Sequence, residues 1–191
     1  MDQNITVIPA TGDRFDDVGC ILAPKNPDAT VCWCLSHRLP AKQNRALLGP
    51  ARGEFVRELC QRPIAPGVLA YVDGKVAGWA AVAPRAETTY ARSKIIPHVD
   101  DLDVWTVWCV KVLAPFRRMG VAVELIRGAA EYARTQGAPA VEGYPVDNGD
   151  QRVDSVLAYV GTRGMFENAG FHKVADTEAV SDGIPRVLMR A

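Results

Sequence analysis

A short turn, Arg117-x-x-Gly120-x-Ala122, joins residues typical of a strand to the start of a helical pattern. Small residues at such a junction let several backbone N–H groups point the same way at a helix N-terminus. These donors and the helix dipole together favour anions, above all phosphate. The chain has neither Gly-x-x-x-x-Gly-Lys-Ser/Thr nor Gly-x-Gly-x-x-Gly after a strand. The turn is therefore a candidate phosphate site that differs from the two most familiar phosphate loops.

The segments on either side of the turn would position it. Residues 104–112 are rich in β-branched and aromatic side chains, which favours a strand. After the turn, apolar residues recur at helical spacing as far as about Gln136, and Gly137 stands where a helix often ends. The predicted apolar face of this helix consists of Val121, Ala122, Leu125, Ile126, Ala129, Tyr132 and Ala133.

The rest of the pattern predicts one mixed α/β domain. A first strand is expected at residues 5–10, followed by helices at 13–22 and 44–62, the second broken at Gly49-Pro50. Asp73-Gly74 is a strong signal for a two-residue hairpin between strands at 67–72 and 75–83. Further strands are expected at 140–144, 171–177 and 185–190, with a long insertion at 145–161 and a short helix at 162–169.

Composition limits the classes of function. The 191 residues are 48% hydrophobic and 23% charged with a net charge of +0, which is ordinary for a single globular domain. Such a balance argues against nucleic acid or an acidic membrane surface as a partner. The chain has no apolar run long enough to span a membrane and no features of a signal peptide at its N-terminus, so a cytoplasmic location is expected.

The cysteines are expected to be buried, reduced thiols. Their number, five, is odd, which suits a reducing compartment. Cys32-Trp33-Cys34 lacks the Cys-x-x-Cys spacing of a zinc knuckle, and the sequence has no second closely spaced pair. No metal site is expected.

The turn and its surroundings resemble the acyl-CoA-binding region of the GNAT superfamily of N-acetyltransferases. The family's loop reads Gln/Arg-x-x-Gly-x-Gly/Ala and lies between its fourth strand and third helix, as Arg117–Ala122 would here. A second segment, Met165-Phe166-Glu167-Asn168-Ala169-Gly170-Phe171, resembles the family helix that ends in Gly-Phe. The resemblance implies a mixed, mostly antiparallel central sheet splayed between strands 4 and 5 and flanked by helices. Residues 1–66 would form a variable N-terminal part, 67–177 the acetyl-CoA-binding core and 178–191 a C-terminal strand.

The resemblance also implies how acetyl-CoA would bind. The backbone N–H groups of Arg118, Met119, Gly120, Val121 and Ala122 would hold the pyrophosphate, with Arg117 adding charge. Val110 and Val112 occupy the fourth-strand positions whose main chain pairs with the pantetheine arm, and the Val110 amide is the candidate donor to the developing oxyanion. Phe166 stands where the family usually has a tyrosine that acts as general acid. A phenyl ring donates no proton, so Phe166 is expected to pack on the cofactor or in the core.

The sequence offers two acidic residues as candidates for the base that removes the amine proton. A primary amine is mostly protonated at neutral pH, so a base must accept its proton. Glu142 on the fifth strand, with Tyr144 on the same face by alternation, and Asp103 before the fourth strand are the candidates. His98 is a weaker one, and Tyr144 or Tyr159 could replace the missing acid. Trp79, Trp105 and Trp108 are expected in the core, although one of them could line the substrate pocket.

The leading hypothesis is an acyltransferase that moves an acetyl group from acetyl-CoA to a primary amine of a small molecule or peptide, by direct attack in a ternary complex. The alternative is a non-catalytic acyl-CoA-binding regulatory module, motivated by Phe166 and by the lack of an obvious base. A homodimer is left open, and the acceptor is not identified.

Overall fold

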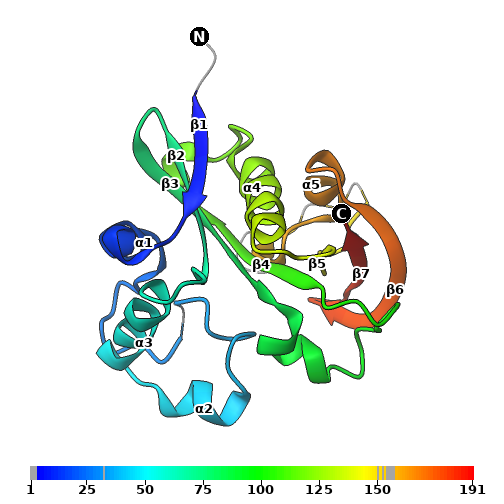
Figure 1. Cartoon of the computed structure of the whole chain (residues 1–191), viewed down its shortest axis with the longest axis horizontal. Coiled ribbons are helices and arrows are strands. Elements are labelled where there is room, and N and C mark those ends of the chain that lie inside the picture. The colour runs from blue at the N-terminus through cyan, green and yellow to red at the C-terminus, as the bar shows by residue number, and fades with distance from the viewer. Residues whose placement is uncertain (1–3, 32, 150, 152, 154–157) are drawn as a thin grey trace.

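The computed structural model describes residues 4–31, 33–149, 151, 153 and 158–191 (Figure 1). Seven strands form one sheet in the order β1-β2-β3-β4-β5-β7-β6. All neighbouring strands are antiparallel except β4 and β5, which are parallel, so the predicted mixed, mostly antiparallel sheet is confirmed. The strands are β1 (Ile5–Pro9), β2 (Gly67–Val72), β3 (Lys75–Pro84), β4 (Trp105–Val112), β5 (Val141–Gly143), β6 (His172–Ser181) and β7 (Ile184–Arg190).

Helices flank the sheet on both faces. The α-helices are α1 (Phe15–Leu22), α2 (Ala41–Ala46), α3 (Pro50–Cys60), α4 (Val121–Thr135) and α5 (Arg163–Asn168). Short 3-10 helices are η1 (Gly12–Arg14), η2 (Arg85–Glu87), η3 (Thr89–Arg92), η4 (Ala114–Phe116) and η5 (Ala158–Val160). Alternate residues of β4 belong to two cores: Val107 packs in the core that contains α4, and Trp108 in the core that contains α1 and α3. The sheet is thus the middle of three layers.

Helix α4 confirms the predicted amphipathic pattern. It buries Val121, Leu125, Ile126 and four further residues against the sheet, while Ala122 of the predicted face is only half-buried. The predicted break in the earlier helix is also confirmed, since α2 ends at Ala46 and α3 begins at Pro50, the first-turn position that proline favours.

The sheet opens between β4 and β5. Their parallel pairing covers only Trp105 with Val141, Thr106 with Glu142 and Val107 with Gly143. The last five residues of β4 therefore have no partner on β5, which leaves one edge of that strand open inside the sheet. This is the splayed arrangement expected beside the fourth strand.

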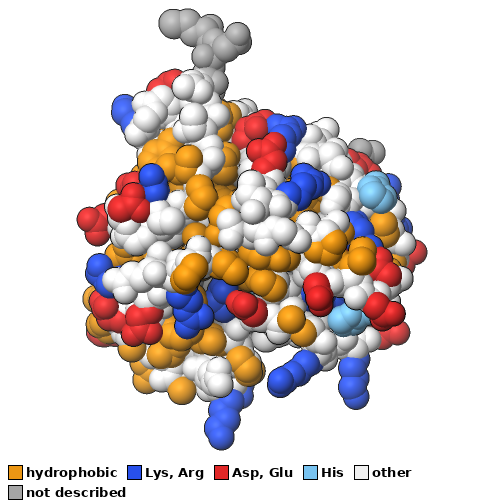
Figure 2. Space-filling view, viewed as in Figure 1, with side chains coloured by type: hydrophobic (Ala, Val, Ile, Leu, Met, Phe, Trp, Pro, Cys, Tyr) orange, Lys and Arg blue, Asp and Glu red, His pale blue; other side chains and the backbone are white. Residues whose placement is uncertain are grey.

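The surface agrees with the neutral composition. Basic and acidic side chains are interspersed over the face in Figure 2. Among the described residues, no helix has the length and apolar character needed to cross a membrane.

Candidate functional site

The turn before α4 holds a row of backbone donors. Arg118 has φ 63° and Gly120, which caps α4, has φ 81°, so the chain passes twice through the left-handed region. Helical hydrogen bonding begins at Val123, whose N–H donates to Gly120 O at 2.9 Å. Within the described chain, the N–H groups of residues 118–122 donate to no protein acceptor. Free donors at a helix N-terminus, beside two arginines, fit a pyrophosphate.

A bulge in β4 lies next to this turn. Trp79 pairs with Lys111 and Ala81 pairs with Trp108, so Cys109 and Val110 of β4 together oppose Ala80 alone. Cys109 has φ 54°, which bends the strand at this point. Such a bulge turns main-chain groups out of the regular ladder, and here it does so at the position expected to supply the oxyanion donor.

One cavity of ≈ 1210 Å³ contacts both the turn and the bulge. Its residues fall into two groups. We call the first the turn wall; it includes Val110, Val112, Arg117, Arg118, Gly120, Val121 and Ala122. We call the second the aromatic wall; it consists of Trp33, Cys34, Ser36, His37, Trp108 and Tyr159. Seven of the nine residues predicted to bind the cofactor therefore line one space.

The other two predicted cofactor residues are not among those that line the cavity. Met119 belongs to the turn, but its partly buried side chain packs against the core that contains α4. Phe166 is fully buried, makes an edge contact with Phe171 at 5.0 Å between ring centroids, and is not among the residues that line the cavity. Of the two roles expected for Phe166, its position matches packing in the core. Its neighbour Met165 is the residue of α5 that lines the cavity.

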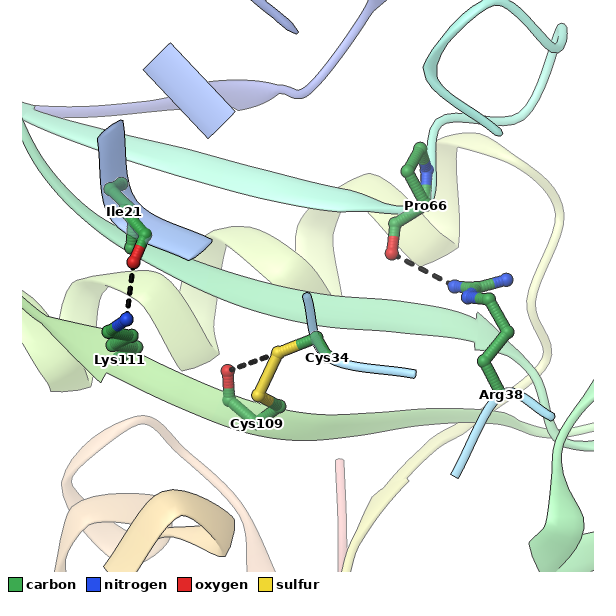
Figure 3. Close-up of a disulfide and its surroundings, with 6 residues drawn as sticks. All are labelled: Ile21, Cys34, Arg38, Pro66, Cys109 and Lys111. Atoms are coloured by element: carbon green, nitrogen blue, oxygen red, sulfur yellow. Dashed lines mark hydrogen bonds between the residues drawn. A yellow bond between two sulfur atoms is a disulfide. The ribbon is translucent and has the colours of Figure 1, made fainter. Parts of the chain in front are cut away.

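The expectation of reduced cysteines is wrong for two of them. Cys34 and Cys109 form a disulfide with 6.1 Å between their Cα atoms (Figure 3). The fold brings the loop after α1 onto the bulge, and local sequence spacing could not reveal that approach. Cys20 and Cys60 are free, and Cys32 lies outside the described residues. Because disulfides are rare in reducing compartments, the cysteines give no support to a cytoplasmic location.

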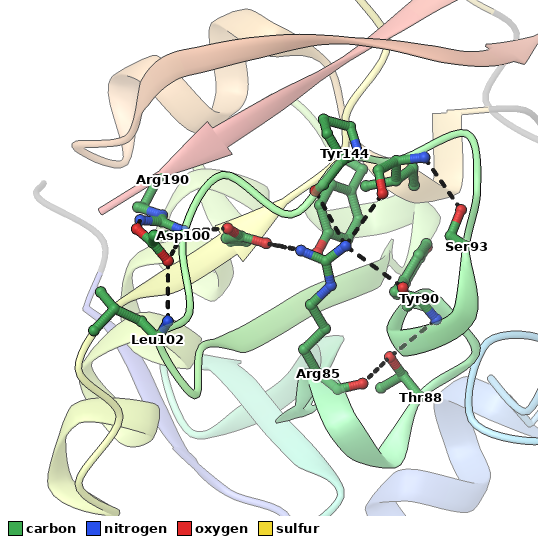
Figure 4. A network of polar contacts seen from close by, with 11 residues as sticks. Arg85, Thr88, Tyr90, Ser93, Asp100, Leu102, Tyr144 and Arg190 are labelled. Carbon is green, nitrogen blue, oxygen red and sulfur yellow. Dashed lines mark hydrogen bonds and ion pairs between the residues drawn. The ribbon is translucent and has the colours of Figure 1, made fainter.

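Arg85, Tyr144 and Arg190 belong to one polar network (Figure 4), and each of them donates a hydrogen bond to the fully buried Glu142. Its Oε2 accepts hydrogen bonds from Arg85 Nη1 at 3.0 Å and from the Tyr144 hydroxyl at 2.8 Å. Its Oε1 accepts from Arg190 Nη2 at 2.6 Å. The side chains of Glu142 and Tyr144 meet, as alternation predicts, although β5 ends at Gly143, one residue before Tyr144. Both carboxylate oxygens are therefore already bonded, and neither residue is among those lining the cavity.

The same network extends to the loop before β4. Arg190 also contacts Asp100 through both of its terminal nitrogens, and this hydrogen bonding lowers the pKa of Asp100 and raises that of Arg190. Burial is the first cause that raises the pKa of Tyr144 far above its ordinary value, and the Glu142 charge adds to it. Tyr144 thus keeps its proton. Asp103 and His98 are exposed and do not line the cavity.

His37 is the site residue that the sequence analysis did not single out as a possible base. It lies in the segment 26–40, which carried no clear periodicity, and a lone histidine gives no signal by spacing. In the fold it belongs to the aromatic wall, and its Nε2 is buried with no hydrogen-bond partner in residues 4–31, 33–149, 151, 153 and 158–191. Trp108 is the predicted core tryptophan that also lines the cavity, whereas Trp79 and Trp105 do not.

Among the described residues, no group of three or more His, Cys, Asp or Glu side chains is arranged to hold a metal ion.

Comparison with known proteins gives a family match and a shared fold. The model of the Acetyltransferase (GNAT) family matches residues 37–153, which includes β4, the bulge, the turn and α4. No curated protein sequence matches the chain. A GNAT-family acetyltransferase structure from Bacillus cereus ATCC 10987 is 14% identical, covers 98% of this chain and 96% of its own, and has a TM-score of 0.54. One from Streptococcus pneumoniae is 11% identical, with 98% and 99% coverage and a TM-score of 0.54. The aminoglycoside acetyltransferase AAC(6')-Ib in complex with coenzyme A is 13% identical, with 98% and 94% coverage and a TM-score of 0.55.

Proposed function

The chain belongs to the GNAT family of acetyltransferases, and on that premise we propose that it moves an acetyl group from acetyl-CoA to a primary amine of a small molecule or peptide. The amine attacks the thioester directly while both substrates are bound. The single observation that carries the proposal is the continuity of the cavity: the free N–H groups of the turn, the β4 bulge and the aromatic wall all border one space.

The turn wall is the proposed cofactor half of the site. Residues 118–122 would hold the pyrophosphate through their N–H groups, and Arg117 and Arg118 add positive charge. Val110 and Val112 lie where β4 has lost its partner β5, so their main chain is available to a pantetheine arm. Acetyl-CoA supplies the activated acetyl group as a thioester. The Val110 N–H at the bulge is the proposed donor to the carbonyl oxygen as negative charge develops on it.

Glu142, Asp103 and Tyr144 are the catalytic groups that the sequence predicts. The ion pairs of Glu142 support a structural role, because both of its carboxylate oxygens are already engaged by two arginines and a tyrosine. Asp103 is exposed and does not line the cavity, so it would need a water chain to reach it. We propose that the base lies in the aromatic wall instead. We further propose that residues 1–191 act as one catalytic domain.

Two measurements test the function. Calorimetric titration of the purified chain with acetyl-CoA should give saturable binding that competes with CoA. Release of free CoA should then depend on both acetyl-CoA and an amine from a panel of small amines and peptides. Binding without turnover on any amine would favour the alternative, a non-catalytic acyl-CoA-binding regulatory module. No binding would contradict both.

A further inference from the structure

The aromatic wall holds His37 in a fixed orientation. The imidazole stacks on Tyr90 of η3 with 4.5 Å between centroids and an interplanar angle of 18°, and lies 6.3 Å from the ring of Tyr159 of η5. Its backbone carbonyl accepts a hydrogen bond from the Thr89 N–H at 2.8 Å. Contacts from two separate segments therefore define which way the ring faces.

One imidazole nitrogen has a neighbour and the other has none. Nδ1 lies 3.5 Å from the Thr89 hydroxyl. Nε2 is buried and has no hydrogen-bond partner among the residues that the structure describes. If Nδ1 carries the proton, it faces the Thr89 oxygen and Nε2 is left as a pure acceptor. A buried acceptor without a partner is unfavourable, and a ligand or a bridging water that donates to it would relieve that cost.

Trp108 provides a second unpartnered group on the same wall. Its ring is almost completely buried, and within the described part of the chain its indole N–H also lacks a hydrogen-bond partner. Trp33, in turn, stacks parallel to Phe15 with 6.0 Å between centroids, so its position in the wall is supported from behind. The wall thus combines flat apolar surfaces with one unsatisfied acceptor and one unsatisfied donor.

We propose that the aromatic wall binds the acceptor as a flat aromatic amine and that His37 Nε2, directly or through one water, takes the proton from the attacking nitrogen. This inference rests on the proposed acetyl transfer. In the step, the amine nitrogen bonds to the carbonyl carbon and its surplus proton passes to Nε2. The carbon–sulfur bond then breaks, and its electron pair stays on the sulfur, which leaves as thiolate.

The electrostatics of the wall favour a neutral amine. Burial, and after it the positive charge of Arg186 on β7, lower the pKa of His37 to about 4, so the imidazole is uncharged at neutral pH. The other titratable groups around the ring, Tyr90 and Tyr159, are phenols; burial raises the pKa of Tyr90 to about 12. An aromatic amine is neutral at pH 7, whereas an alkylamine is an ammonium that this wall would not attract. The nitrogen becomes acidic only after it bonds to the acyl carbon, which lets a weak base accept its proton.

The acceptor class is tested with matched amines. The ring of p-anisidine is the same as that of 4-methoxybenzylamine, but only the second is charged at neutral pH. At pH 7 we expect kcat/KM for p-anisidine to exceed that for 4-methoxybenzylamine by at least 10-fold. A preference for the benzylamine, or no turnover of p-anisidine by protein that binds acetyl-CoA, would overturn the acceptor class.

The role of His37 is tested with His37→Gln, and with His172→Gln as the matched control because His172 is exposed on β6. His37→Gln should lower kcat by about 10²-fold or more with acetyl-CoA affinity unchanged, while the control keeps wild-type rates. Equal rates in the two variants would refute the role. Should His37→Gln fail to fold, the test uses NMR of the wild-type protein. The product N-acetyl-p-anisidine should then shift the His37 ring and Trp108 indole signals, and unshifted signals at saturation would also refute it.

These measurements distinguish failure of the proposed acetyl transfer from failure of the inference about the aromatic wall. A wild-type chain that does not bind acetyl-CoA contradicts the proposed function itself. A chain that binds acetyl-CoA and acetylates amines, yet tolerates His37→Gln, contradicts only the inference about the aromatic wall.

Discussion

Cys34 and Cys109 are covalently joined across a sequence separation of 75 residues, and both line the cavity. The bond ties the loop that carries Trp33 and His37 to the bulge in β4. The aromatic wall and the strand that would position the acetyl group are therefore held together by one covalent link. Because both cysteines line the cavity, loss of the disulfide should lower the stability of the chain and weaken acceptor binding.

Reduction of this disulfide should destabilise the chain. Closing a long loop restricts the unfolded state, and removal of such a bond costs about 2–4 kcal/mol. We expect Cys34→Ser/Cys109→Ser to lower the free energy of unfolding in urea by this amount and to raise the acceptor KM more than the Kd of acetyl-CoA. Cys20→Ser is the control because Cys20 is free and exposed. A wild-type urea midpoint that does not move with reductant would contradict the prediction.

Substitution of Gly120 should separate folding from cofactor binding. A Cβ at this position would meet no protein atom within 4 Å, so the protein itself has room for a side chain. The φ of 81° costs a non-glycine residue about 1–2 kcal/mol. Gly120→Ala should therefore show only this loss in thermal unfolding. Gly120→Glu should in addition abolish acetyl-CoA binding in calorimetry, because it puts bulk and negative charge beside the phosphates. Near-native affinity in folded Gly120→Glu would refute the assignment of the turn.

Glu142→Gln distinguishes a structural carboxylate from a catalytic base. The substitution leaves the buried Arg85 without its counter-charge, and breaking a buried pair in this way costs about 3–5 kcal/mol. We expect a large fall in urea stability and modest loss of kcat in the fraction that remains folded. Asp103→Asn, at an exposed position, should change neither. If Glu142 were the base, kcat would instead fall by about 10²–10⁴ with stability nearly intact.

Phe166→Tyr tests whether this chain needs the family's usual acid. The ring fits so closely against β5 that a Cβ on Gly143 would lie 2.0 Å from Phe166 Cε1. A hydroxyl added there would be buried, and without a partner it would cost roughly 1–3 kcal/mol. We expect lower thermal stability and little change in kcat, since a thiolate can leave without a protein acid. Phe166→Leu is the packing control and should lose stability through the space it leaves. A large gain in kcat from Tyr would instead show that wild type lacks a needed proton donor.

Much of the fold follows from local sequence. Asp73-Gly74 specifies a hairpin, Gly49-Pro50 ends one helix and starts the next, and the apolar period after Gly120 defines α4. Each of these features depends on backbone preferences or side-chain spacing within a few residues, so each can be predicted without the tertiary structure. The turn of residues 117–122 belongs to the same class, because its donors come from the backbone at a helix start.

The contacts of the aromatic wall and of Glu142 were decided by tertiary structure alone. The disulfide of Cys34 with Cys109, the arginines that engage Glu142, and the stacking of His37 on Tyr90 all join segments that are distant in sequence. Such contacts leave no periodic pattern, since they depend on how the sheet and loops pack together. The sequence alone does not show whether a lone histidine or glutamate lines a cavity or forms a buried ion pair. The burial and the contacts of the side chain distinguish the two cases, and both depend on the folded chain.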